Sequence, residues 1–361
     1  MYSHSAMLDE LKTVADGAEH VSVDRQQMEK VAPILNSRLG AVDYGLKRGV
    51  PELEPGDLLQ YYMVAGAHNF LFWDYDESKQ IGVDPSTIHV NGQVVRGAGT
   101  AYACHYRAAR QDKKNLDADY LASMTLAQTQ DYYRDEKTGE VALKLIAERQ
   151  AKFNETGRVL REMYDGSFVN LLERADGWLF RDDSEGVAQQ LLKNFPLSYG
   201  DWPYCKLIMV TLGNLYESID VLFSEPSRYR ELIDFKDAER LEVGADYYRP
   251  YFLYRVGVLR ISEAFKERLL NRTLIEVDSQ MEQEYRAWTI LATREMAELI
   301  GRNPHELARE TWAMGFLRCR PCYVGVPEDE VPCSYRPICH SYNVEVHLMR
   351  APWPLVYTDN Y

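Results

Sequence analysis

Apolar residues recur every three or four positions along most of the chain, which is the spacing of an amphipathic helix. The clearest example begins at Ser279 with S-Q-M-E, a sequence typical of a capping box. Apolar residues then follow on one face of the predicted helix: Met281, Tyr285, Trp288, Ala292 and Leu299. The same spacing predicts helices over residues 141–163, 203–223 and 250–270, the last with Pro250 in its first turn.

Strand patterns are few and short. They cover residues 70–73, 342–348 and 88–95, the last reading as a hairpin with Asn-Gly at its turn. No repeat, low-complexity tract or flexible linker divides the chain. We therefore expect a mainly α fold: a single compact helical domain over residues 1–317, with a small β element. Residues 318–361, rich in Cys, Pro and Tyr, are expected to form an irregular C-terminal extension packed on that domain.

The chain has 361 residues and a net charge of −14. Binding to a nucleic acid polymer depends on clustered Lys and Arg, and no dense basic run occurs. A small anionic ligand remains compatible with this charge, because two or three local cations can hold one phosphate. The N-terminus lacks a secretion signal and no window is long and apolar enough to span a membrane, so we expect a cytoplasmic protein. The sequence leaves the oligomeric state open.

Four cysteines lie close together near the C-terminus: Cys319, Cys322, Cys333 and Cys339. Four thiolates can close a tetrahedral zinc site. The second pair lacks the C-x2-C spacing of the first, so the pattern favours thiols that bind no metal over a structural zinc site. The sequence also lacks a P-loop, a G-x-G-x-x-G turn, an H-E-x-x-H helix and a G-x-S-x-G elbow. No cofactor is predicted.

Asp246 is an isolated acid within the aromatic and apolar stretch "VGADYYRPYFLYRVGVL". It is either a helix-capping acid or a catalytic carboxylate in a pocket of rings. With Pro250 in the first turn, the cap position falls on Arg249, and Asp246 lies too far upstream for a standard cap. The residues alone leave the two interpretations evenly balanced.

Two other charged features also allow a structural and a functional interpretation. Lys206 stands at the start of an apolar run. It is either a helix-end lysine with a solvated head group or a clamp for a phosphate or carboxylate. In the 279–300 helix, Glu282 and Arg286 have the spacing of a surface ion pair, while a buried network that orders a site is the alternative. Helical spacing favours the surface pair.

Seven segments, in order, resemble the queuosine salvage protein family, the queuosine 5′-phosphate N-glycosylases. The segments are "HNFLFWDYDESKQIGV" (68–83), "GAGTAYACHYRA" (97–108), "GRVLREMYDGSFVNLLERADG" (157–177), "FPLSYGD" (195–201), "YCKLIMVTLGNLY" (204–216), "ADYYRPYFLYRVGVL" (245–259) and "SQMEQEYRAWTILATREMAEL" (279–299). The resemblance ends near Trp312 and covers most of residues 60–315. It implies an all-helical fold similar to DNA glycosylases. It also implies an enzyme that hydrolyses queuosine 5′-monophosphate to the 7-deazapurine base queuine and ribose 5-phosphate.

The resemblance also implies roles for individual residues. Asp246 falls on the family's catalytic Asp, in a reaction where a fixed carboxylate stabilises positive charge on the sugar. The implied substrate-binding residues are Phe72, Trp73, Lys206, Tyr247, Arg249, Glu282, Glu284, Arg286 and Trp312. Among them, Phe72 and Trp73 correspond to walls against the flat base, and Lys206 to a phosphate contact.

The sequence departs from the family pattern around the implied ligand. Tyr248 stands where the family has Arg after Asp-Tyr, and Leu207 and Met209 replace an Arg and a Gln after the family's Lys. A different modified nucleotide or nucleoside is therefore a possible substrate. The alternative function is a non-catalytic protein on the same scaffold, which binds a modified nucleotide or is a zinc-stabilised interaction protein.

Overall fold

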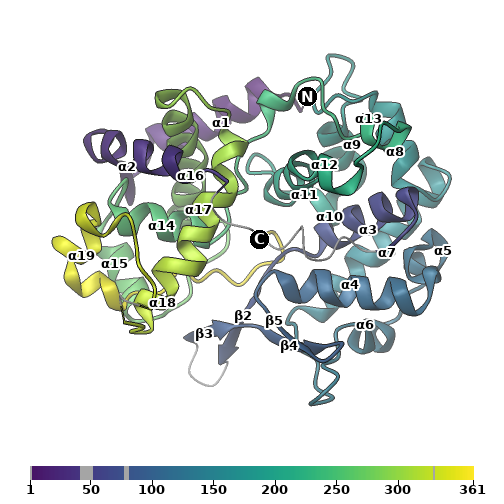
Figure 1. The fold of residues 1–361 in the computed structure, drawn as a ribbon, viewed down its shortest axis with the longest axis horizontal. Coiled ribbons are helices and arrows are strands. Elements are labelled where there is room, and N and C mark those ends of the chain that lie inside the picture. Colours follow the sequence, from purple (N-terminus) through teal and green to yellow (C-terminus); the bar gives the residue numbers. More distant parts are fainter. Residues whose placement is uncertain (1, 41–51, 77–80, 328–329) are drawn as a thin grey trace.

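The computed structural model describes residues 2–40, 52–76, 81–327 and 330–361 (Figure 1). The helices of the first 200 residues are α1 (His4–Asp16), α2 (Arg25–Arg38), α3 (Pro55–Ala67), α4 (Gly99–Gln111), α5 (Ala118–Ala122), α6 (Leu126–Tyr132), α7 (Ile146–Met163), α8 (Phe168–Ala175), α9 (Val187–Asn194) and α10 (Pro196–Tyr199). Those that follow are α11 (Lys206–Glu217), α12 (Ile219–Leu222), α13 (Arg228–Glu231), α14 (Tyr248–Val256), α15 (Glu263–Leu270), α16 (Gln280–Leu299), α17 (Ala308–Met314), α18 (Arg320–Tyr323) and α19 (His340–Asn343). The mainly α prediction is confirmed.

The strands form three separate antiparallel pairs. These are β1 (Val21–Val23) with β6 (Leu259–Ile261), β2 (Trp73–Asp76) with β3 (Ile81–Pro85), and β4 (Thr87–Val90) with β5 (Gln93–Arg96). The β4–β5 pair is the predicted hairpin. Asn91 and Gly92 both have positive φ angles, 51° and 73°, as the tight Asn-Gly turn requires. Two strand predictions are wrong: residues 70–73 contribute only Trp73 to a strand, and residues 342–348 lie in helical turns.

The predicted helices differ in how closely the structure follows them. Ser279 caps α16 and its Oγ accepts from the Glu282 amide at 3.3 Å, but the Glu282 carboxylate accepts from Asp278 N at 2.9 Å and not from Ser279. The single helix predicted over 250–270 is wrong. Gly257, with φ at 86°, ends α14, and β6 separates it from α15.

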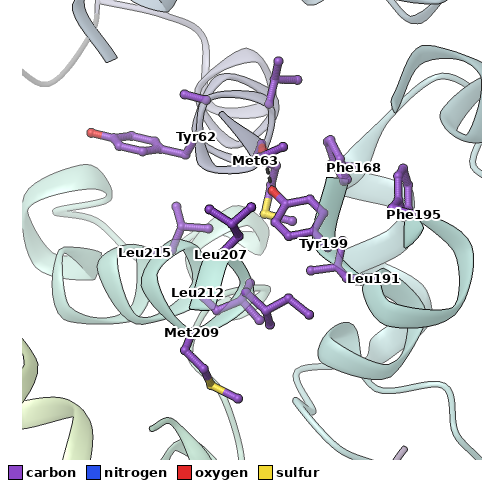
Figure 2. Close-up of a cluster of buried hydrophobic side chains, with 14 of the residues drawn as sticks. Tyr62, Met63, Phe168, Leu191, Phe195, Tyr199, Leu207, Met209, Leu212 and Leu215 are labelled. Carbon is purple, nitrogen blue, oxygen red and sulfur yellow. Dashed lines mark hydrogen bonds between the residues drawn. The ribbon is translucent and has the colours of Figure 1, made fainter. Parts of the chain in front are cut away.

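Buried apolar side chains form two cores. The first core lies among α3 to α11, on the right in Figure 1. Figure 2 shows its centre, where the Tyr199 hydroxyl from α10 donates to the Met63 carbonyl of α3 at 2.5 Å. The α3 and α11 helices approach closely at Gly66, where an added Cβ would lie 2.1 Å from Thr211 Oγ1. Glycine at this position therefore sets the distance between these two helices.

The second core lies among α2 and α14 to α19, on the left in Figure 1. Helix α16 contributes to both cores: Ala287 and Ile290 belong to the first, and Ala292 and Met296 to the second. Helix α16 thus presents apolar side chains to both sides, which fixes the position of one core relative to the other.

The segment 351–361 runs between the two groups of helices, with its end near the centre of Figure 1. Its backbone accepts hydrogen bonds from three places: Ile275 N donates to Leu355 O at 2.8 Å, the Tyr254 hydroxyl to Pro352 O at 2.7 Å, and Leu71 N to Tyr361 O at 3.1 Å. Several of its side chains are part of the second core. The division into residues 1–317 and 318–361 stays a prediction.

Candidate active site

A cavity of about 320 Å³ lies where the two groups of helices meet, a volume near the lower end of the roughly 300–1,000 Å³ of small-molecule sites. From the side of the first core it is lined by Tyr61, Tyr62, Asn69, Tyr102, Lys206 and Asn214. The side of the second core contributes Asp246, Arg249, Arg309 and Trp312. The structure therefore brings together four of the residues that the sequence singles out: Lys206, Asp246, Arg249 and Trp312.

Asp246 is both a helix cap and a cavity residue. Helix α14 begins at Tyr248, two residues earlier than Pro250 suggests, so the expected cap at Arg249 is wrong. The Oδ1 atom of Asp246 accepts from the amides of Tyr248 at 2.9 Å and Arg249 at 3.0 Å. Because the two interpretations of Asp246 do not exclude each other, its capping bonds leave open a role for the carboxylate in the cavity.

Arg249 fixes the other carboxylate oxygen. Its Nη1 donates to Asp246 Oδ2 at 2.7 Å and to the Gly244 carbonyl at 2.7 Å, and its Nε donates to the Ala308 carbonyl at 3.2 Å. Charge-assisted bonds of this kind are short and directional. Together with the two amides they hold the Asp246 carboxylate in one orientation.

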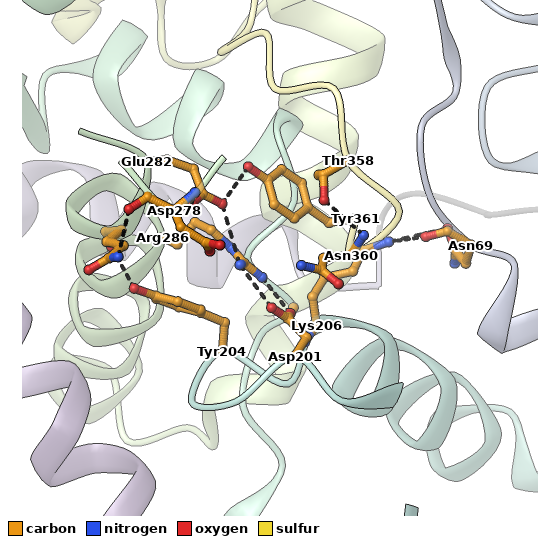
Figure 3. Close-up of polar contacts among 12 residues, drawn as sticks. Asn69, Asp201, Tyr204, Lys206, Asp278, Glu282, Arg286, Thr358, Asn360 and Tyr361 are labelled. Atoms are coloured by element: carbon orange, nitrogen blue, oxygen red, sulfur yellow. Dashed lines mark hydrogen bonds and ion pairs between the residues drawn. The ribbon is translucent and has the colours of Figure 1, made fainter. Parts of the chain in front are cut away.

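Lys206 is the first residue of α11, as a helix-end lysine would be, but its side chain is buried and does not reach solvent. Its Nζ donates to the Asn69 carbonyl and lies 3.5 Å from Asn69 Oδ1 (Figure 3). Burial lowers the pKa of Lys206 to about 7, against the opposing attraction of Asp246 and Asp201. The cavity thus holds an ammonium group that exchanges its proton near neutral pH.

Comparison with known proteins gives this cavity a context. A family profile described as queuosine salvage protein matches residues 50–321. The chain belongs to the queuosine salvage protein family. Three relatives each carry the name queuosine 5′-phosphate N-glycosylase/hydrolase. The Nematostella vectensis protein is 25% identical to this chain, and the match covers 78% of this chain and 79% of the relative. The Bos taurus protein is also 25% identical, with 83% of this chain and 87% of the relative covered. The Sphaerobacter thermophilus protein is 28% identical, with 69% of this chain and 72% of the relative covered.

Three of the substrate-binding residues that the family resemblance implies, Glu282, Glu284 and Arg286, lie outside the cavity lining. The guanidinium of Arg286 binds the Asp201 carboxylate at 2.9 and 2.5 Å and lies 3.5 Å from Glu282, which accepts from the Tyr361 hydroxyl at 2.8 Å (Figure 3). The Glu284 carboxylate accepts from the amides of residues 19–21 at 2.6–2.9 Å. All three side chains are buried, so the surface ion pair favoured by helical spacing is wrong, and the alternative of a buried network is what forms.

This network connects to the cavity through Asp201. Its Oδ2 accepts from the Lys206 amide at 3.0 Å and from Arg286 at 2.5 Å. The first turn of α11, which carries the lysine, is therefore fixed by the same carboxylate that pairs with the buried arginine.

Phe72, Trp73 and Tyr247 are buried and also lie outside the cavity lining. The Phe72 amide donates to the Tyr247 hydroxyl at 3.3 Å, and Trp73 lies in the second core. Trp312, by contrast, lines the cavity, with its ring 5.2 Å from that of Phe316 and nearly parallel to it. Of the aromatic residues named from the salvage family pattern, Trp312 is the one that borders the cavity directly.

Sequence reasoning missed six polar cavity residues: Tyr61, Tyr62, Asn69, Tyr102, Asn214 and Arg309. Asn69, Tyr102 and Asn214 lie inside segments that carry the family resemblance, and this was the available signal. Tyr61 and Tyr62 lie outside those segments, and aromatic residues on a helix most often belong to the core. Burial raises the pKa of Tyr61, Tyr62 and Tyr102, so their hydroxyls stay protonated at neutral pH. The Tyr61 hydroxyl donates to the Tyr102 carbonyl at 3.0 Å, which leaves the hydroxyls of Tyr62 and Tyr102 to donate to a ligand.

Within the described ranges, no three His, Cys, Asp or Glu side chains are grouped so that they could hold a metal ion. The four C-terminal cysteines are all among the described residues and are unpaired. The Cys339 thiol donates to the Arg255 carbonyl at 3.2 Å, and burial raises the pKa of Cys319, Cys333 and Cys339. The positions of these side chains therefore give the four-cysteine zinc hypothesis no support.

Among the residues that the structure describes, no helix is both long enough and apolar enough to cross a membrane.

Proposed function

We propose that this protein hydrolyses the N-glycosidic bond of queuosine 5′-phosphate, or of a closely related 7-deazapurine nucleotide, and releases the free base for salvage into tRNA modification. The observation that carries the proposal is the Asp246 carboxylate. It lines the cavity and is held in one orientation by three donors, in a family whose relatives are named for this reaction.

The chemistry needs a fixed anion at the sugar. When the bond between C1′ and the base nitrogen breaks, the electron pair leaves with the base and the sugar acquires oxocarbenium character. A preorganised carboxylate in a water-poor cavity stabilises that positive charge more strongly than it would in water. In this proposal Asp246 supplies the charge. Water then adds its oxygen to C1′, and the proton that it releases replaces the one taken up by the departing base, which gives ribose 5-phosphate.

The departing base must gain a proton. A 7-deazapurine lacks the N7 atom that purine glycosylases can protonate, so the proton goes to another base nitrogen or to an oxygen. We propose that the Lys206 ammonium donates it, because Lys206 lines the same cavity and its pKa lies near 7. Stacking on Trp312 holds the base, with a typical contribution of about 1–3 kcal/mol for an aromatic contact.

The proposal includes three further statements: the substrate is a free nucleotide and not a nucleic acid polymer, the reaction needs no redox cofactor, and the protein acts in the cytoplasm. The alternative, a non-catalytic binding protein on the same scaffold, is not favoured. The family resemblance implies that Asp246 is the catalytic Asp, and the relatives are named as enzymes.

The test is release of free queuine from queuosine 5′-monophosphate, followed by chromatography, in the wild type and in Asp246→Asn. The amide of asparagine keeps the capping acceptor and removes the charge. We expect the rate to fall about 100- to 1,000-fold, as when other preorganised stabilisers of transition-state charge are removed.

The matched control is Asp237→Asn. Asp237 is also buried and accepts from the amides of Leu179 at 2.7 Å and Phe180 at 3.0 Å, but it lies outside the cavity lining. It should keep wild-type turnover if it folds. Full turnover in a folded Asp246→Asn variant would refute the catalytic assignment, and an inactive wild type would refute the substrate.

A further inference from the structure

Among the residues that the structure describes, three positively charged side chains line the cavity, and they differ in what they bind. Arg249 is bound to Asp246 and to two backbone carbonyls. Lys206 donates to the Asn69 carbonyl and lies close enough to Asp246 for that charge to raise its pKa. Both cations therefore balance the charge at the end of the cavity where the glycosidic bond would break. Arg309, on α17, is held from a different place.

Arg309 is held at the opposite end of α11 from Lys206. Its Nε forms an ion pair with the Glu217 carboxylate, and its Nη2 donates to Ser218 Oγ at 2.9 Å. Glu217 is the last residue of α11 and Ser218 follows it. An arginine has five N–H donors in a planar fork, so contacts at Nε and Nη2 orient the guanidinium while it borders the cavity.

The cavity wall between these two ends is one face of α11. Lys206, Val210 and Asn214 line it at successive four-residue steps. Eight residues of α-helix rise about 12 Å, so this wall is long enough to accommodate a nucleotide lengthwise. A ligand with its C1′ near Asp246 would direct its 5′ end along this wall toward Arg309.

The environment of Arg309 is suited to an anion. Burial raises the pKa of Glu217 to about 7, against the opposing effect of Arg309, so near neutral pH an approaching phosphate meets less than a full negative charge there. Arg309 also lies close enough to Tyr62 for its positive charge to lower the pKa of the Tyr62 hydroxyl, in opposition to burial. The guanidinium therefore lies beside a cavity hydroxyl that can donate a second hydrogen bond to the phosphate.

We propose that Arg309 binds the 5′-phosphate of the substrate and makes the enzyme select a nucleotide over the corresponding nucleoside. This inference rests on the proposed function, and it gives the phosphate contact to Arg309 and not to Lys206, the residue that the family resemblance implies. Lys206 remains at the end of the cavity where the bond breaks.

The first experiment compares kcat/KM for queuosine 5′-monophosphate and for queuosine in the wild type, Arg309→Gln and Arg309→Lys. Loss of a charge-assisted contact should lower the ratio of nucleotide to nucleoside about 10- to 100-fold in Arg309→Gln, mainly through KM for the nucleotide. Arg309→Lys keeps the charge and should give an intermediate ratio. Arg302→Gln is the matched control, because Arg302 is an exposed arginine nearby that pairs with Glu306 outside this cavity.

The second experiment measures binding of ribose 5-phosphate, with ribose as the comparison, by titration calorimetry on the same proteins. Its result does not depend on the identity of the base. Binding of ribose 5-phosphate that weakens in Arg309→Gln and survives in Arg302→Gln supports the inference, even if the wild type releases no queuine and the proposed function fails.

The inference is overturned if a folded Arg309→Gln variant keeps the wild-type ratio and the wild-type affinity for ribose 5-phosphate. It is also overturned if the wild type releases queuine but neither prefers the nucleotide nor binds ribose 5-phosphate, in which case the proposed function would stand without it.

Discussion

Replacement of Arg286 by methionine tests whether the charged residues of α16 serve the fold or the ligand. The guanidinium is buried between the rings of Tyr204 and Tyr361, 4.1 and 4.3 Å from their centres, and it binds Asp201 through two nitrogens. Methionine fills a similar volume and removes the charge. The Asp201 and Glu282 carboxylates would then be buried without their shared cation.

The size of the effect follows from that burial. Removing one member of a buried ion pair typically costs about 3–5 kcal/mol, because the remaining charge is left desolvated. The unfolding entropy of a chain of 361 residues is about 0.8 kcal/mol/K, taking roughly 2.1 cal/mol/K per residue. The melting temperature of Arg286→Met should therefore fall by about 4–7 °C.

The assay is thermal unfolding by calorimetry, with Arg25→Met as the control. Arg25 pairs with Glu295 on the surface at 3.0 Å, and an exposed pair of this kind is worth about 0–1 kcal/mol, so its melting temperature should change by no more than about 1–2 °C. KM should stay close to wild type in folded Arg286→Met. An unchanged melting temperature together with a raised KM would show that Arg286 acts on the substrate, and the assignment to the fold would be wrong.

Two further predictions concern helix packing and pH. Gly66→Ala should destabilise the protein by about 1–3 kcal/mol, because its Cβ would lie 2.1 Å from Thr211 Oγ1. Gly213→Ala has no atom within 4 Å of its added Cβ, so it should be neutral or stabilising by up to about 1 kcal/mol. Equal denaturation midpoints for the two variants would contradict this account of the α3–α11 contact. Lys206 is protonated below its pKa of about 7 and loses the proton above it, so kcat should fall about tenfold per pH unit above that value if Lys206 donates a proton to the base. The same alkaline decline in the residual activity of Lys206→Met would assign it to another group.

The parts of the fold that follow local rules were predictable from the sequence. The Asn91-Gly92 hairpin and the long helix after Ser279 depend on turn chemistry and on apolar spacing within one segment. The break at Gly257 was missed because the apolar pattern continues through it. That glycine also packs tightly against the distant His340, whose Cβ would lie 2.6 Å from an added Cβ, and no local pattern encodes such a contact.

The site was predictable in its chemistry and less so in its geometry. Asp246 and Lys206 were identified as charges in apolar surroundings, and both line the cavity. Arg309 was missed because its sequence neighbours give it the appearance of an ordinary surface helix, and its role depends on α17 meeting the end of α11 in space. Glu284 was identified, but its partners are amides of residues 19–21, far away in the chain.

The position of segment 351–361 has a consequence for how the protein acquires its fold. This segment is synthesised after both groups of helices, yet Tyr361 pairs with Leu71 and with Glu282 in the buried network. Contacts between residues so distant in the chain are slow to form, since the loop between them must close first. During translation, the two groups of helices would therefore assemble before the segment between them is available. Tyr361 would then complete the buried network only after the two groups of helices have met, as one of the last steps of folding.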